Sequence, residues 1–165
     1  MKDLLEKISS YNIFNYLLPG VIFAALIDAT TSFKLLQPDI VIGVFIYYFL
    51  GSIVSRVGSI AIDPALKKVG FIKFSEYSDF IAAEKADPKI GILSEVNNMY
   101  RTFLSLLILI VAVKIYDHVA STSEFLTAIS PYVLVLSLLI LYLASYKKQT
   151  AYIVKRVESV CKEKQ

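Results

Sequence analysis

The residues of this sequence that could carry out catalysis are few. The chain has one histidine, His118, and one cysteine, Cys161. The topology predicted below places them on opposite sides of a bilayer, which excludes a thiol-imidazole pair. The sequence contains no His-Glu-x-x-His motif, no glycine-rich phosphate loop and no Cys/His cluster with metal-binding spacing. We therefore expect no enzymatic activity and no cofactor or metal.

Ionisable residues in or near apolar stretches are better candidates for function, because charges in lipid are costly. Arg56 lies toward one end of an apolar stretch. It either reaches the phosphates of the inner leaflet or faces a bundle interior, where it pairs with a carboxylate or lines a conduit. Lys114, Asp117 and His118 lie at helical spacing near the end of another stretch, and Lys114 can reach Asp117 or His118. These three residues are either interface anchors or the outer mouth of a pore.

The hydropathy pattern defines the elements that hold these residues. The chain has 165 residues, 56% of them hydrophobic, and a mean hydropathy of +0.63, whereas soluble domains are about 45–50% apolar. A bilayer core roughly 30 Å thick is crossed by a helix of about 20 apolar residues. Four stretches qualify, at about 13–27, 40–62, 103–119 and 127–146. We expect a single all-α domain over residues 1–165, an integral membrane protein with four transmembrane helices and helical extensions.

Two prolines bear on these stretches. The first stretch is short and contains Pro19-Gly20, so it either spans with a kink, which neighbouring groups can compensate, or forms a re-entrant or interfacial helix. The fourth stretch places Pro131 in its first turn, where a missing N–H has little effect.

The basic residues predict the orientation. The N-terminus, the segment 63–101 and the tail 147–165 together carry 14 of the 17 Lys and Arg residues. The loops 28–39 and 120–130 hold only Lys34. Because positive charge marks the cytoplasmic side, we expect both termini and the middle segment in the cytoplasm.

The cytoplasmic parts are predicted to be helical. Residues 2–11 are amphipathic and fit an interfacial helix, with a frayed start as the alternative for the first few residues. The middle segment is predicted to form a helix over 75–86, capped by Ser75 or Ser78, and one long helix over 88–119. The tail extends the fourth helix, with Tyr152, Val157 and Val160 as a weak apolar stripe that packs on the middle segment or on a second subunit.

Small residues at helical spacing in the second stretch, Gly51, Ser55 and Ser59, allow close helix packing within one subunit or between subunits. A four-helix unit this small leaves little interior room for a conduit, so conduction would run between the subunits of a homo-oligomer, with a tetramer favoured. The basic residues of the cytoplasmic parts either follow from topology alone or bind an anionic ligand, such as a nucleotide, an oligonucleotide or lipid headgroups. These candidates are Lys67, Lys68, Lys73, Lys147, Lys148, Lys155 and Arg156.

Two stretches carry a resemblance: residues 11–20, YNIFNYLLPG, and residues 93–101, LSEVNNMYR. Together they resemble small bacterial membrane proteins that act as effectors of anti-phage defence with a partner nucleotidyltransferase, as in Hailong-type systems. In the second stretch Asn97 and Arg101 share a helical face, and Glu95 can reach Asn98. These residues make a polar junction that serves either as a gate or only as a structural contact. The resemblance implies an oligomeric effector of the bacterial inner membrane, held closed by a cytoplasmic ligand or partner enzyme and opened to permeabilise the membrane.

Two other functions compete with this one. The same helices would suit a non-conducting scaffold or accessory subunit that recruits a soluble partner. A small transporter is disfavoured, because the stretch 13–27 lacks the membrane-embedded carboxylate expected of a multidrug exporter of this size.

Overall fold

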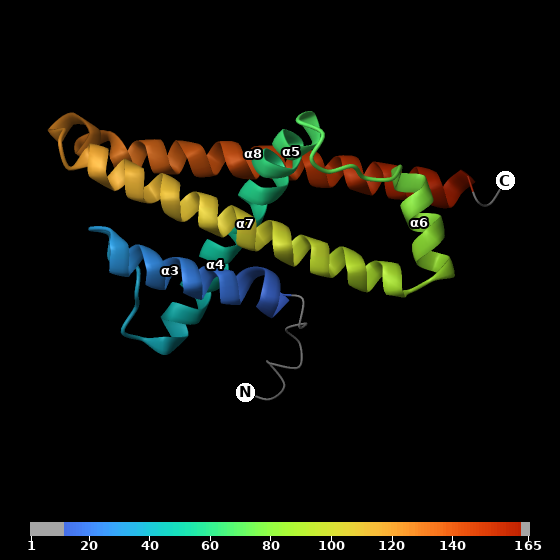
Figure 1. Cartoon of the computed structure of the whole chain (residues 1–165), viewed down its shortest axis with the longest axis horizontal. Coiled ribbons are helices and arrows are strands. Elements are labelled where there is room, and N and C mark those ends of the chain that lie inside the picture. The colour runs from blue at the N-terminus through green and yellow to red at the C-terminus, as the bar shows by residue number, and fades with distance from the viewer. Residues whose placement is uncertain (1–11, 163–165) are drawn as a thin grey trace.

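The computed structural model describes residues 12–162, and over this range it contains helices and no strands (Figure 1). The interfacial helix predicted over 2–11 lies outside the described residues. In chain order the elements are the π turn η1 (Ile13–Leu17), α3 (Leu18–Thr30), α4 (Ile40–Val57), the π turn η2 (Gly58–Ile62), α5 (Asp63–Lys68), α6 (Tyr77–Ala86), α7 (Lys89–Ala120) and α8 (Glu124–Lys162).

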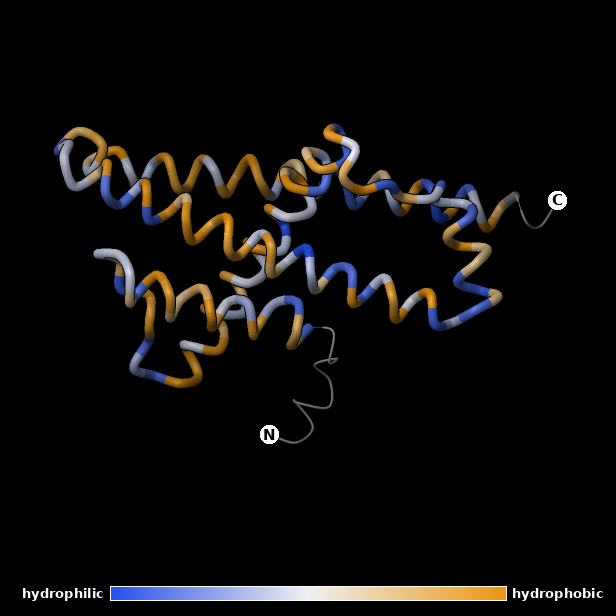
Figure 2. Tube along the Cα trace, viewed as in Figure 1, coloured by the Kyte–Doolittle hydropathy of each residue, from blue (hydrophilic) through white to orange (hydrophobic). Residues whose placement is uncertain are grey.

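Four continuous helical segments are long and apolar enough to cross a membrane: Ile13–Thr30, Ile40–Lys68, Lys89–Ala120 and Glu124–Cys161. The chain is therefore a multi-pass membrane protein with a helical bundle, and the predicted all-α membrane class is confirmed. Figure 2 shows hydrophobic residues over most of these helices and hydrophilic ones at the end where α6 lies. We call this end, formed by residues 63–101 and 147–162, the polar end.

Both π turns occur just before a proline. Pro19 follows η1 and Pro64 follows η2, each in the first turn of the next α-helix. A proline ring inside a helix lacks the N–H donor and collides with the carbonyl four residues earlier. In each π turn, the backbone N–H of the residue before the proline donates to the carbonyl five residues earlier. Leu18 thus donates to the Ile13 carbonyl, and Asp63 donates to the Gly58 carbonyl. The first and second spans therefore continue through their prolines as unbroken helices.

The core lies where α3, α4 and α7 meet. A Cβ atom on Gly20 would lie 1.7 Å from the Tyr47 carbonyl oxygen, and one on Gly51 would lie 1.7 Å from that of Tyr16. These two glycines thus bring the backbones of the first two spans into contact. On α7 the Ser105 hydroxyl donates to the Val54 carbonyl at 2.7 Å, which fixes α7 against α4.

The helices α7 and α8 form an antiparallel pair joined by a short turn at the end opposite the polar end, and α6 bridges them at the polar end (Figure 1). Two local predictions are wrong. The fourth helix starts at Glu124, before residue 127, so Pro131 lies inside it and not in its first turn. The N-cap of α6 is Glu76, without a side-chain cap from Ser75 or Ser78.

Candidate functional site

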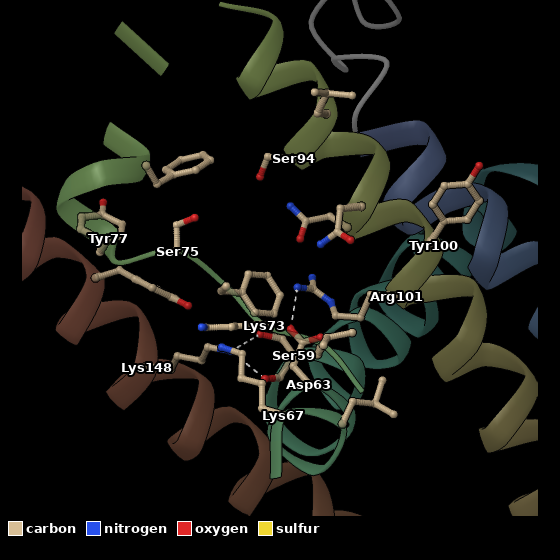
Figure 3. Close-up of a pocket in the computed structure, with 18 of the residues that line it drawn as sticks. Ser59, Asp63, Lys67, Lys73, Ser75, Tyr77, Ser94, Tyr100, Arg101 and Lys148 are labelled. Atoms are coloured by element: carbon tan, nitrogen blue, oxygen red, sulfur yellow. Dashed lines mark hydrogen bonds and ion pairs between the residues drawn. The ribbon is translucent and has the colours of Figure 1, made fainter. Parts of the chain in front are cut away.

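A cleft of about 1060 Å³ opens at the polar end, between the end of the second span, the segment 71–77, α6, α7 and α8. Figure 3 shows side chains from all these elements facing a common space. Six basic and two acidic side chains line the cleft: Arg56, Lys67, Lys73, Arg101, Lys148 and Lys155, with Asp63 and Glu76. The excess of positive charge within one concave surface favours an anionic ligand.

The floor of the cleft contains an ion pair between α7 and α5. A guanidinium nitrogen of Arg101 donates to an Asp63 carboxylate oxygen at 3.2 Å, and the two side chains are only 17% and 12% exposed. The Nε atom of Arg101 is buried and has no hydrogen-bond partner among the described residues. Arg101 therefore neutralises Asp63 and retains a donor for which the described residues supply no acceptor.

A second contact ties α8 to the π turn beside this pair. The Lys148 ammonium donates to the Ser59 carbonyl oxygen at 2.6 Å and to its hydroxyl at 2.7 Å. The Ser59 carbonyl lacks a regular helical donor, because the Asp63 N–H bonds to the Gly58 carbonyl and Pro64 has no N–H. The Lys148 side chain thus satisfies a carbonyl that the proline leaves open.

Aromatic rings interleave with the cations. The Lys67 ammonium lies 4.1 Å from the centroid of the Phe74 ring, a cation–π distance. The rings of Tyr77 on α6 and Tyr152 on α8 have centroids 5.9 Å apart. The aromatic lining consists of Phe71, Phe74, Tyr77, Phe80, Tyr100 and Tyr152. A surface of this kind can hold a phosphate group and an apolar or planar group together.

The structure brings together only part of the predicted site. Among the anionic-ligand candidates Lys67, Lys73, Lys148 and Lys155 line the cleft, whereas Lys68, Lys147 and Arg156 are exposed outside it. From the junction motif Asn97, Asn98 and Arg101 line the cleft, and Glu95 does not. Arg56, predicted as a pore or gating residue, also lies in the cleft lining.

The small residues of the second span pack within the chain. Gly51 lies against the Tyr16 backbone, the hydroxyls of Ser55 and Thr102 are 3.3 Å apart, and Ser59 binds Lys148. The face formed by these small residues therefore packs against other helices of the same chain.

The remaining candidates, Lys114, Asp117 and His118, lie at the other end of α7. Asp117 accepts a hydrogen bond from the Ser32 backbone N–H at 3.1 Å and another from the Ser32 hydroxyl. It therefore anchors the loop between α3 and α4, whereas Lys114 and His118 are exposed on the single chain. The structure does not bring these residues into the cleft with Arg56.

Sequence reasoning missed Asp63 and the aromatic lining. Asp63 directly precedes Pro64 at the end of an apolar stretch, and a carboxylate at such a place needs a cationic partner when it is buried. This requirement could have identified Asp63 from the sequence, but it does not identify Arg101 as the partner.

No group of three His, Cys, Asp or Glu side chains in the range 12–162 could hold a metal ion. No known family model matches the chain, and neither a curated protein nor a solved structure matches it.

Proposed function

We propose that this chain is an oligomeric effector of the bacterial inner membrane, with both termini in the cytoplasm, that permeabilises the membrane when a cytoplasmic ligand is released. The ligand is a nucleotide or an oligonucleotide bound in the cleft. The observation that carries the proposal is the lining of the cleft, which combines six basic side chains with six aromatic rings.

Phosphate oxygens suit this lining, because Lys and Arg donate charge-assisted hydrogen bonds to them. The aromatic rings offer faces on which a base can stack. Arg56, Arg101 and Lys148 belong to three of the apolar helices. A ligand that contacts all three favours the helix arrangement to which it binds best, and its release shifts the population toward another arrangement.

The binding part of the proposal is tested with the full-length chain in phosphatidylcholine nanodiscs and a short fluorescein-labelled single-stranded oligonucleotide, followed by fluorescence anisotropy. Lys73→Gln and Lys155→Gln each remove one cleft charge, and Lys68→Gln and Lys147→Gln remove one charge outside it. We expect the cleft variants to raise Kd about tenfold each, since a lost contact of about 1.4 kcal/mol corresponds to that factor. We expect the control variants to leave Kd near the wild-type value.

An equal loss in both pairs of variants would mean general charge attraction and would contradict a binding cleft. Competition by phosphatidylglycerol, with no oligonucleotide binding in its absence, would assign the cleft to lipid headgroups instead.

The effector part is tested in bacterial cells with a voltage-sensitive dye. The Lys73→Gln/Lys155→Gln double variant should depolarise cells more than the wild-type chain does, because the ligand no longer holds it closed. The Lys68→Gln/Lys147→Gln variant should match the wild type. An unchanged potential with the double variant confirmed in the membrane would contradict the pore and favour the scaffold.

A further inference from the structure

The outer face of α8 carries a heptad pattern at the polar end. Tyr146, Thr150, Ile153, Val157 and Val160 follow one another at alternating steps of four and three residues, and all are exposed. Ile153 and Val157 are each 56% exposed and Tyr146 is 76% exposed. We call these five residues the outer stripe. Spacing of about 3.5 residues keeps such a stripe on one side of a helix when it coils around another helix.

The opposite face of the same part of α8 lines the cleft. Lys148 and Lys155 are cleft residues, and Tyr152 contacts Tyr77. Of the apolar stripe predicted from Tyr152, Val157 and Val160, the Tyr152 ring packs on Tyr77 of α6 in the middle segment, whereas Val157 and Val160 are exposed. One helix thus has a ligand side and a free apolar side.

The outer stripe continues into the apolar part of α8. The same steps lead backward from Tyr146 to Leu143, Leu139 and Leu136, all of them exposed. None of the most apolar 18-residue stretch of α8 is buried within the chain. At 39 residues the helix is about 58 Å long, well beyond the roughly 30 Å of a bilayer core.

This continuity identifies the kind of partner. Lipid can cover only the part of the face inside the bilayer, and a soluble protein only the part outside it. A helix that crosses the membrane and continues beyond it covers both, and α8 of a second copy is such a helix. Copies inserted in the same orientation would pack their α8 helices in parallel.

The flanking residues are compatible with that packing. In a parallel pair in register, the side chains that face each other beside the stripe are Gln149 with Val154 and Arg156 with Cys161. No like-charged pair arises at these positions, so charge repulsion does not oppose the contact. We infer that the outer stripe is the contact surface between α8 helices of two copies of this chain. This inference deepens the oligomer of the proposed function by assigning its cytoplasmic contact.

The test is disulfide cross-linking in native membranes. Cys161→Ser removes the natural cysteine, and Ile153→Cys then places a single thiol in the outer stripe. Glu158→Cys in the same background is the matched control, exposed on α8 but about 120° away from the middle of the stripe. Copies with two different epitope tags are co-expressed, so that a product carrying both tags identifies a pair of the same chain.

We expect mild oxidation to give a dimer with both tags from Ile153→Cys and at least tenfold less from Glu158→Cys. Equal yields, no dimer from Ile153→Cys, or cross-linking to a different protein would overturn the inference. Ile153→Ser supplies a second readout, because it leaves an exposed helix position folded and should shift the purified chain toward the monomer in native mass spectrometry. These readouts need no oligonucleotide, so their failure is distinguishable from a failure of ligand binding.

Discussion

The Asp63 carboxylate lies 3.2 Å from a guanidinium nitrogen of Arg101, although the two residues are 38 positions apart in the sequence. Beside them Lys148 holds the Ser59 carbonyl. The junction between α4 and α5 is therefore fixed to α7 by one cation and to α8 by another. A ligand that competes for either cation would act directly on the packing of three spans.

Removing one partner of the buried pair should destabilise the chain. Arg101→Gln leaves the Asp63 carboxylate largely buried without its counter-charge, and about 3 kcal/mol is the expected scale for such a change. The double variant Asp63→Asn/Arg101→Gln should be more stable than Arg101→Gln alone, because no charge is left unpaired. Equilibrium unfolding in detergent measures both, and equal stability of the single and double variants would contradict a coupled pair.

Lys148→Met should lower the free energy of unfolding by about 2 kcal/mol, since it leaves the Ser59 carbonyl without its donor. Lys147→Met is the control, because Lys147 is the neighbouring lysine and is exposed. If Pro64 is the cause of the open carbonyl, Pro64→Ala should reduce the cost of Lys148→Met, because a backbone N–H becomes available. A double-mutant cycle tests this dependence, and strictly additive effects would rule it out.

Gly51→Ala should disrupt the contact between the first two spans. Its Cβ would lie 1.7 Å from the Tyr16 carbonyl oxygen, which is backbone and cannot turn aside. Gly91→Ala is the matched control on α7, where the nearest atom is the end of the flexible Glu84 side chain at 3.1 Å. We expect a large fall in thermal stability for the first variant and a small change for the second, measured by thermal unfolding. A stable Gly51→Ala protein would show that these helices do not approach so closely.

Asp117→Ala should loosen the loop between α3 and α4. The loop would lose the two hydrogen bonds that Ser32 donates to Asp117, one from its backbone N–H and one from its hydroxyl. Amide exchange at Ser32 should therefore become faster. His118→Ala, at the adjacent exposed position, should leave this exchange unchanged. Hydrogen–deuterium exchange with mass spectrometry distinguishes the two, and identical exchange in both variants would exclude the anchor.

The membrane helices could be predicted from the sequence because their signal is local: a run of apolar residues is long enough or it is not. The long helix predicted over 88–119 is observed as α7, Lys89–Ala120, for the same reason. The apolar stretch predicts a start of the fourth helix at about residue 127, whereas α8 begins at Glu124. The Ser123 hydroxyl accepts from the Leu126 N–H at 3.4 Å, a capping contact that marks the earlier start.

The cleft could be predicted only in part. Basic residues of the polar end were visible in the sequence, but whether each one faces a shared space depends on helix rotation. Lys147 and Lys148 are neighbours, and only Lys148 lines the cleft. The pairing of Arg101 with Asp63 requires the packing of α7 on the second span, which no local pattern contains.

The π turn at Gly58–Ile62 acts as a one-residue insertion. It changes the direction in which the following side chains point relative to those before the turn. In a regular α-helix Asp63 would be rotated by about 80° from Ser55, whereas one extra residue in the turn reduces the offset to about 20°. Ser55 and Asp63 therefore both face α7, where Ser55 contacts Thr102 and Asp63 contacts Arg101. Converting this segment into a regular α-helix without removing a residue would rotate the acid by about 100° away from its arginine, even though every residue of the cleft would still be present in the chain.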